Sequence, residues 1–198
     1  FPIIAATRSS NSLKNMPFIL ESRRRKPKTL NSRYPSATFI DLTSKASRPW
    51  VKFSPFFPHG GIPVPVAPTT RAHSVEGIWQ GLKVFKTEDV NLARFEVTTV
   101  RGIKRAAKKF DRVIGHRNGL KGDDLLDYVT ARKKIYLPAY KWVLENKLQE
   151  ELEELREMGA NGDVVLLDYE TNADVENTHN PLSHASLVIA FLEDRWPA

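Results

Sequence analysis

The sequence predicts a mostly helical α+β domain with few short strands, preceded by an extended basic arm. Three observations support this prediction. Apolar residues recur at helical spacing, mainly in the second half of the chain; one short run is apolar enough for a buried strand; and ten of the 13 prolines lie before residue 70. We therefore expect residues 1–36 to form an extended arm with little regular structure and residues 37–198 to form a single compact domain.

The early part of this body is expected to hold a strand, a rigid loop and the clearest helix. Residues 37–43 alternate in polarity and are rich in β-formers, which predicts a strand. Residues 50–68 combine aromatic side chains with prolines, which predicts a loop or edge strand. The apolar spacing predicts a helix over residues 74–85, with Ser74 as N-cap and Glu76 in the first turn.

The remaining elements follow from the same rules. We expect helices at 88–96 and 99–110, a turn-rich loop at 115–119, a helical stretch from 123 or 124 to 158, a buried strand at 163–169, a polar loop at 172–179 and a last helix opening at Asn180 and Pro181. Pro138 should break or kink the long stretch, because proline removes a helical hydrogen bond, so we expect two helices. Gly159 should follow the end of the second of them.

The net charge of +7 comes entirely from the predicted arm. Residues 1–36 hold eight basic residues and one acidic residue, whereas residues 37–198 hold 22 of each. The cluster at residues 23–28 is therefore the candidate contact for nucleic acid. A solvated basic tail without a partner is the alternative.

Composition excludes several kinds of site. The chain has no cysteine, so it has no disulfide, no zinc–thiolate site and no cysteine nucleophile. Its five histidines show no ligand spacing, so we expect neither a metal site nor a cofactor. No apolar run is long enough to cross a membrane. We expect an intracellular, cytoplasmic protein, with an organelle as the alternative if the acid-free first 20 residues belong to a transit segment.

The first candidate site lies on the predicted helix at 74–85. Glu76, Gln80 and Lys83 share one polar face at i, i+4 and i+7. An acid, an amide and a base in this order can hold a polar ligand while the acid moves a proton. The alternative is an ordinary solvated helix face.

Three further segments carry polar or aromatic side chains suited to a ligand. Residues 168–174 follow the predicted buried strand and offer carboxylates that could activate a water, or they form an Asn/Asp turn. Residues 54–61 could stack on a flat ring or cover the core. Of the basic residues at 101–121, Arg101 and the 115–119 loop are the best phosphate candidates, although such residues often only coat a helix.

The order of these segments resembles the NADAR family, also called YbiA-like proteins. The resemblance spans roughly residues 38–196 and leaves the arm unmatched. It rests on an aromatic-Ser segment, a Ser-x-Glu…Gln…Lys helix, a Gly/Arg-rich middle, a late Asn…Asp segment and a closing helix. These are Phe53–Phe56, Ser74–Lys83, Arg112–Asn118, Thr171–Asp174 and Ser183–Arg195.

The resemblance implies an N-glycosidase fold linked to ADP-ribose metabolism. It would make Glu76 the principal acid/base and Asp174 the second carboxylate. It further implies that Trp79 or Phe56 stacks on the base, that Lys83 and Arg101 contact phosphate, and that Asn172 holds the ribose. Gln80 would also bind the substrate. The expected function is hydrolysis of an N-glycosidic bond in an ADP-ribosylated base or a phosphoribosyl-type nucleoside. The alternative is a non-catalytic module that binds ADP-ribose or nucleic acid, or an assembly subunit that uses the basic arm.

Overall fold

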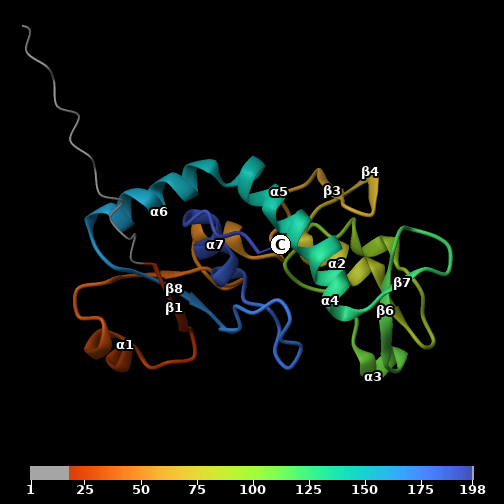
Figure 1. Ribbon diagram of the computed structural model, residues 1–198, viewed down its shortest axis with the longest axis horizontal. Coiled ribbons are helices and arrows are strands. Elements are labelled where there is room, and N and C mark those ends of the chain that lie inside the picture. Colours follow the sequence, from red (N-terminus) through yellow and green to blue (C-terminus); the bar gives the residue numbers. More distant parts are fainter. Residues whose placement is uncertain (1–17, 198) are drawn as a thin grey trace, which may run out of the picture.

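The computed structural model describes residues 18–197 and shows an α+β fold (Figure 1). Helices hold more of the described residues than strands do. In chain order the elements are β1 (Phe18–Ser22), α1 (Pro27–Arg33), β2 (Thr38–Asp41), the 3-10 turn η1 (Trp50–Phe53), β3 (Ile62–Val64), β4 (Ala67–Ala72), α2 (Val75–Leu82), β5 (Lys83–Phe85), the 3-10 turn η2 (Leu92–Arg94), α3 (Ala107–Phe110), β6 (Val113–Arg117), β7 (Leu125–Leu126), α4 (Tyr128–Ala131), the π-helical turn η3 (Arg132–Tyr136), α5 (Leu137–Lys147), α6 (Gln149–Asn161), β8 (Val164–Asp168) and α7 (His184–Leu192).

A small parallel sheet forms one half of the molecule. Its strand order is β1-β8-β2, and both outer strands run parallel to β8. All five residues of β8 are buried, as expected for a central parallel strand. Because the strands are parallel, their carboxyl ends meet at one edge, and in such sheets this edge commonly hosts a ligand site.

Helices cover both faces of this sheet. Leu166 of β8 joins the main core with residues of α6 and α7, such as Leu155 and Val188. Val165 and Leu167 point to the other face and pack on Leu30 of α1. Figure 1 shows α1 lying apart from α6 and α7, on the far side of the strands.

The other half is built around α2. An antiparallel sheet, β5-β6-β7, follows this helix, and the β3-β4 hairpin precedes it. Every residue of α2 is buried. Gly77 and Gly81 allow close approach of the η2 segment: a Cβ on Gly77 would lie 2.6 Å from the carbonyl oxygen of Arg94, and one on Gly81 would lie 2.3 Å from the ring of Phe95.

Part of the predicted arm belongs to the folded body. Residues 18–22 pair with β8, and residues 27–33 form α1. Glu21 is buried and accepts hydrogen bonds from Arg25 and Arg33, at 2.6 and 2.7 Å. The expectation of an extended segment is therefore wrong for residues 18–36, because strand pairing and this ion cluster order them. Residues 1–17 of the predicted arm lie outside the described residues.

Three predictions in the middle of the chain are also wrong. Residues 88–96 hold only the short turn η2, because their backbone takes part in tertiary bonds such as that from the N–H of Asn91 to the carbonyl of Gly81. The helix expected at 99–110 shortens to α3, since Gly102 has a φ of +74°, which a helix does not accept. The loop expected at 115–119 is largely strand β6, paired with β5 and β7.

The long helical stretch breaks later than predicted. Its N-cap is Asp127, and the interruption falls at Leu148, where α5 gives way to α6. Pro138 directly follows the π-helical turn η3, and the changed hydrogen bonding of such a turn accommodates a residue that has no backbone N–H to donate. Gly159 lies inside α6 rather than after it, and a Cβ there would come within 2.9 Å of the Phe18 ring.

Other elements lie where the sequence predicts them. β2 confirms the strand at 37–43, and β8 confirms the buried strand at 163–169. The helix at 74–85 is confirmed up to Leu82, after which the chain turns into β5. The last helix begins at His184, with Ser183 rather than Asn180 as its cap.

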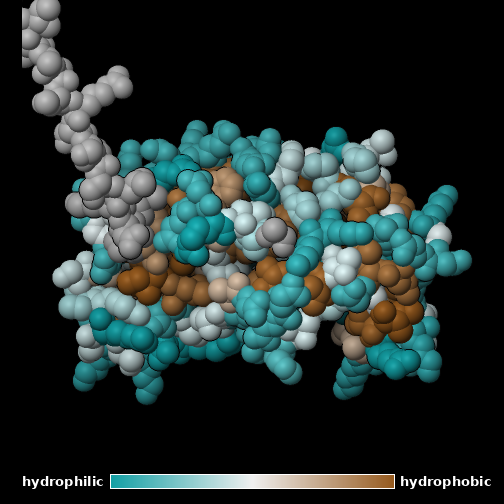
Figure 2. Space-filling view, in the orientation of Figure 1, coloured by the Kyte–Doolittle hydropathy of each residue, from teal (hydrophilic) through white to brown (hydrophobic). Residues whose placement is uncertain are grey.

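Within residues 18–197, no helix has the length and apolar character needed to cross a membrane. Figure 2 shows a mostly hydrophilic face with apolar side chains gathered in places, including the region over β6. Val113 and Ile114 of this strand are 40% and 47% exposed.

Candidate functional site

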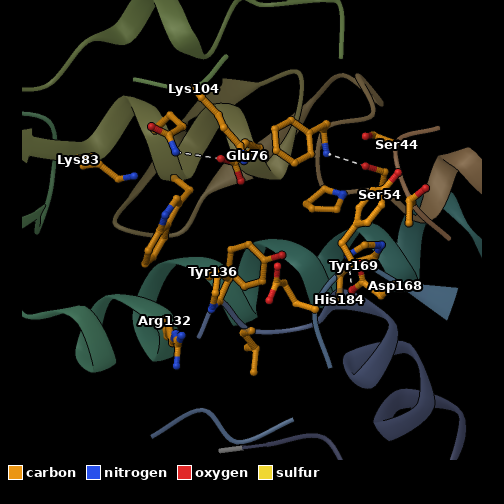
Figure 3. Close-up of a pocket in the computed structure, with 18 of the residues that line it drawn as sticks. Ser44, Ser54, Glu76, Lys83, Lys104, Arg132, Tyr136, Asp168, Tyr169 and His184 are labelled. Carbon is orange, nitrogen blue, oxygen red and sulfur yellow. Dashed lines mark hydrogen bonds and ion pairs between the residues drawn. The ribbon is translucent and has the colours of Figure 1, made fainter. Parts of the chain in front are cut away.

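A pocket of about 590 Å³ lies between α2 and the carboxyl ends of the parallel strands (Figure 3). Both halves of the molecule contribute to its wall. The volume is in the range of cavities that hold small-molecule ligands. The lining includes Arg24, Ser44, Phe56, Glu76, Trp79, Gln80, Lys83, Lys104, Tyr128, Arg132, Tyr136, Asp168, Tyr169, Glu170 and His184.

The carboxyl group of Glu76 is fixed inside this pocket. Ser74 caps α2 by accepting the N–H of Gly77, and the N–H of Glu76 donates to the carbonyl of Pro55 at 2.8 Å. One carboxylate oxygen, Oε1, accepts a hydrogen bond from Nε2 of Gln80 at 2.9 Å. Only 8% of Glu76 is exposed, and this burial raises the pKa of its carboxyl above the ordinary value. The group is therefore suited to holding a proton and giving it up.

Two ammonium groups lie near this carboxyl. Lys83 lies at the junction of α2 and β5, and burial lowers the pKa of its amine although the charge of Glu76 opposes the shift. Lys104 packs its ammonium over the ring of Phe56 at 5.3 Å. Neither lysine forms a hydrogen bond or ion pair through its side chain with any residue between 18 and 197. This end of the pocket can therefore accept an anion.

Arg105 is a structural neighbour of these lysines. Its guanidinium donates to the carbonyls of Gln80, Lys83 and Asp89 at 2.6 to 3.1 Å. Its own N–H donates to Oε1 of Gln80, which fixes the amide that holds Glu76. Arg105 therefore orients the acid rather than offering a free charge.

Aromatic rings line the space beside Glu76. Trp79 meets Tyr136 and Tyr128 edge to face, at centroid distances of 5.8 and 5.7 Å. Its other neighbour is His116, with ring centroids 3.8 Å apart. Phe56 and Trp79 both line the pocket, so a flat ring that enters it has partners for stacking.

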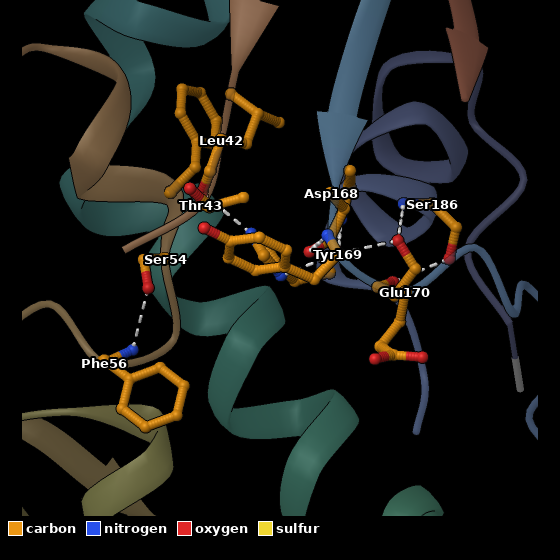
Figure 4. Close-up of polar contacts among 12 residues, drawn as sticks. Leu42, Thr43, Ser54, Phe56, Asp168, Tyr169, Glu170 and Ser186 are labelled. Atoms are coloured by element: carbon orange, nitrogen blue, oxygen red, sulfur yellow. Dashed lines mark hydrogen bonds and ion pairs between the residues drawn. The ribbon is translucent and has the colours of Figure 1, made fainter. Parts of the chain in front are cut away.

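The carboxyl end of β8 carries a buried ion pair. Oδ2 of Asp168 lies 2.9 Å from Nδ1 of His184 and accepts a hydrogen bond from the hydroxyl of Ser183 at 2.8 Å (Figures 3 and 4). Nε2 of His184 donates to the carbonyl of Leu42 at 2.8 Å. Because both ring nitrogens are engaged, the pair joins the ends of β8 and β2 and is not free to shuttle protons.

These contacts set the charge of the pair. Burial opposes ionisation of Asp168, but the charge and the hydrogen bond of His184 lower the pKa of its carboxyl to about 2. Burial likewise opposes the charged imidazole, but the carboxylate of Asp168 raises the pKa of His184. Each partner therefore favours the charged form of the other.

The structure brings together five of the eight residues predicted from the sequence. Phe56, Glu76, Trp79, Gln80 and Lys83 all line the pocket. Glu76, Gln80 and Lys83 are not on a solvated helix face, since α2 is buried and its polar side chains point into a cavity.

The other three predicted residues, Asn172, Asp174 and Arg101, do not line the pocket. The side-chain amide of Asn172 donates to the carbonyls of Asn177 and Asn180, and the carboxylate of Asp174 accepts the N–H of Glu176. These two residues form Asx turns that shape their own loop. Arg101 is exposed on the turn before α3. The carboxylates of the 168–174 segment that line the pocket are those of Asp168 and Glu170.

Three arginines of the basic cluster at 23–28 form internal ion pairs. Arg23 pairs with Asp41 at 2.6 Å and Arg25 with Glu21 at 2.6 Å. Arg24 lines the pocket, pairs with Glu170 and donates to the carbonyl of Tyr169. Within the part of the chain that the structure describes, Lys26 and Lys28 are the members of the cluster without an ion pair.

Several pocket residues were not singled out by the sequence. Lys104 lies in a segment that was wrongly predicted as helix, Arg24 lies in the predicted arm, and Tyr136 was predicted as an apolar position of the long helical stretch. The strand-end rule does point to Asp168 and Glu170, the first and third residues of the 168–174 segment. Among residues 18–197 no cluster of His, Asp and Glu could hold a metal ion.

The fold is thus an α+β fold with one cavity whose lining combines a buried acid, aromatic rings and two lysines without an ion pair among residues 18–197. By sequence, the chain belongs to DUF6939, a family of unknown function, which it matches over residues 22–188. The match begins inside the predicted arm and includes α1, which agrees with the folded state of that helix. No curated protein and no solved structure matches the chain significantly.

Proposed function

We propose that the pocket hydrolyses an N-glycosidic bond in an ADP-ribosylated base or a phosphoribosyl-type nucleoside. The observation that carries this proposal is the environment of Glu76, a buried carboxyl of raised pKa. It faces a cavity that is also lined by aromatic rings and by two lysines without an ion pair among residues 18–197. The resemblance of the motif order to the NADAR family supports the same reaction.

Glu76 has the features of a general acid. Cleavage of an N-glycosidic bond leaves the bonding electron pair on the base, and a proton on that base nitrogen makes departure easier. Burial raises the pKa of Glu76 and so favours its protonated form more than in an exposed glutamate, and the protonated form can supply this proton. The hydrogen bond from Gln80 holds Oε1 in place and leaves the other oxygen to face the ligand.

Glu170 is the second carboxylate of the proposal. It lines the pocket from the carboxyl end of the parallel sheet, and its side chain is 33% exposed, so water reaches it. The sugar cation that forms when the base leaves is stabilised by a nearby negative charge. Glu170 would then take a proton from the attacking water, whose oxygen bonds to the anomeric carbon. The proposed reaction needs only water as its second substrate.

Phosphate and base binding follow from the remaining side chains. Lys83 and Lys104 offer charge to a phosphate without first breaking an ion pair within the described chain. Phe56 and Trp79 offer faces to the base. The two ends of the ligand would thus be held on either side of the bond that breaks.

The proposal is tested by mass-spectrometric detection of the released base. The protein is incubated with ADP-ribosylated guanine nucleotides, ADP-ribosylated DNA and RNA, and phosphoribosyl pyrimidines. We expect turnover of at least one of these, lost in Glu76→Gln and kept in Glu150→Gln, which changes an exposed carboxyl in the first turn of another helix. Absence of turnover with every substrate, or full activity of Glu76→Gln, contradicts the proposal.

A further inference from the structure

Tyr136 occupies the middle of the pocket wall. It is the last residue of the π-helical turn η3, and such turns are frequent at functional sites. Its ring lies edge-on to Trp79 at 5.8 Å and nearly parallel to Tyr140 at 6.1 Å. Figure 3 shows Tyr136 below Glu76, with Asp168 farther to the right. Packing from two rings thus fixes its position.

The hydroxyl of Tyr136 has no hydrogen-bond partner among residues 18–197. Its neighbours in the same region do have one: the hydroxyl of Tyr140 donates to the carbonyl of Phe53 at 2.7 Å, and that of Tyr128 accepts from Arg132 at 3.5 Å. A phenol that packs against the core but keeps its hydroxyl in a cavity usually meets a polar group there. The hydroxyl of Tyr136 can therefore donate a hydrogen bond to a ligand and accept one from it.

The phenol is also a neutral group. Burial raises the pKa of Tyr136 well above its ordinary value, and the negative charges of Glu76 and Asp168 raise it further. It therefore keeps its proton across the physiological range and can donate a hydrogen bond to an uncharged oxygen. This differs from the ammonium end of the pocket, which suits an anion.

We propose that Tyr136 binds a sugar hydroxyl and thereby makes the centre of the pocket specific for the glycosyl part of its ligand. This inference rests on the proposed function, because it places the sugar between the acid at Glu76 and the strand ends. It adds a specificity-determining residue that the expected site did not contain. Loss of one such hydrogen bond should weaken sugar binding without changing phosphate binding.

The test compares ribose 5-phosphate with inorganic phosphate as probes, titrated against the full chain by NMR. For Tyr136→Phe we expect the affinity for ribose 5-phosphate to fall about tenfold while the affinity for phosphate is unchanged. Tyr140→Phe is the matched control, since it removes a neighbouring phenol hydroxyl that bonds only to protein. In that control the ratio of the two affinities should stay at the wild-type value.

Two outcomes overturn the inference in distinguishable ways. If Tyr136→Phe keeps the wild-type ratio, or if Tyr140→Phe changes it equally, Tyr136 does not select the sugar, while the proposed hydrolysis can still hold. If neither probe binds the wild-type protein, the anion end of the pocket is wrong, and the proposed function falls together with this inference.

Discussion

Asp168 and His184 form a buried ion pair, 2.9 Å between Oδ2 and Nδ1, that ties the end of β8 to the start of α7. The second ring nitrogen reaches the carbonyl of Leu42, just after β2. The pair thus fixes the strand ends from which Asp168, Tyr169 and Glu170 line the pocket. Its strength determines how well that wall holds its shape.

We predict that Asp168→Asn lowers the free energy of unfolding by about 3 kcal/mol, because it leaves a buried imidazole without its counter-charge. The pKa of Asp168 is depressed below 3.8 and that of His184 is raised above 6.5. The pair therefore contributes its full stabilisation of the folded state between pH 3.8 and pH 6.5. Its contribution falls as pH drops towards 2, and again as pH rises through the raised pKa of His184. Urea unfolding at pH 6 measures the loss, and an unchanged midpoint would contradict this role.

His116 should make the protein sensitive to mild acid. It is 1% exposed, neither ring nitrogen has a partner among residues 18–197, and burial next to the charge of Lys83 lowers its pKa to about 3. Since the unfolded chain takes up the proton near pH 6.5, stability falls as pH drops from there towards 3. We expect His116→Phe to reduce the loss of unfolding free energy between pH 8 and pH 5 by about 2 kcal/mol. Equal losses in both proteins would show that the pKa of His116 does not differ between the folded and the unfolded state.

The segment that contains β1 and α1 should be essential for folding. Without residues 1–36, β8 loses its partner β1, and Val165 and Leu167 lose their cover by Leu30. We predict that a protein of residues 37–198 shows no cooperative unfolding transition by circular dichroism. If residues 37–198 unfold cooperatively at the same temperature as the full chain, residues 1–36 are an arm that the fold does not need.

A single substitution tests the same packing more gently. Leu30 is 5% exposed and is the residue of α1 buried against the sheet. Leu30→Ala should lower the free energy of unfolding by about 2 to 5 kcal/mol, the usual cost of a cavity at a buried leucine. The neighbouring exposed change Asn31→Ala serves as control and should cost far less.

The sequence predicted the buried strands and the α2 helix because their signals are local. Val164–Leu167 is a short apolar run that begins with two β-branched residues and closely follows Gly162, which favours an interior strand, and Ser74 with the apolar spacing after it indicates a helix start. The face of Glu76, Gln80 and Lys83 followed from helix geometry alone. That this face borders a cavity depends on how the chain folds back, which no local pattern encodes.

The errors share a different cause. We predicted that residues 18–36 form an arm because their charges are almost all basic. In the fold, however, Arg23 is neutralised by Asp41 and Arg25 by Glu21. Asp174 looked like an acid beside a strand end, but its turn directs it away from the pocket. Tertiary ion pairs and loop paths of this kind join residues far apart in sequence, so composition and spacing did not reveal them.

Arg132, which lines the pocket, should hold the loop of residues 175–180 in place. Its guanidinium is 2% exposed and donates to the carbonyls of Val175, Asn177 and Asn180 at 2.7 to 2.8 Å. We predict that Arg132→Lys, which cannot span three carbonyls, costs about 2 to 4 kcal/mol and speeds amide exchange between residues 175 and 180. Lys134→Arg, an exposed change on the same turn, is the control. Unchanged exchange in Arg132→Lys would mean that the loop is held by other contacts.

The central claim is that Glu76 donates the proton that releases the base. The most direct measurement is kcat/KM against pH for the wild type and for Glu76→Gln, on whichever glycosidic substrate the protein turns over. Because the protonated form is the active one and its pKa is raised, the wild-type rate should fall as pH rises through that pKa. We predict that Glu76→Gln loses about 100- to 10,000-fold and also loses this pH dependence. A variant that keeps both the rate and the alkaline fall would contradict the account.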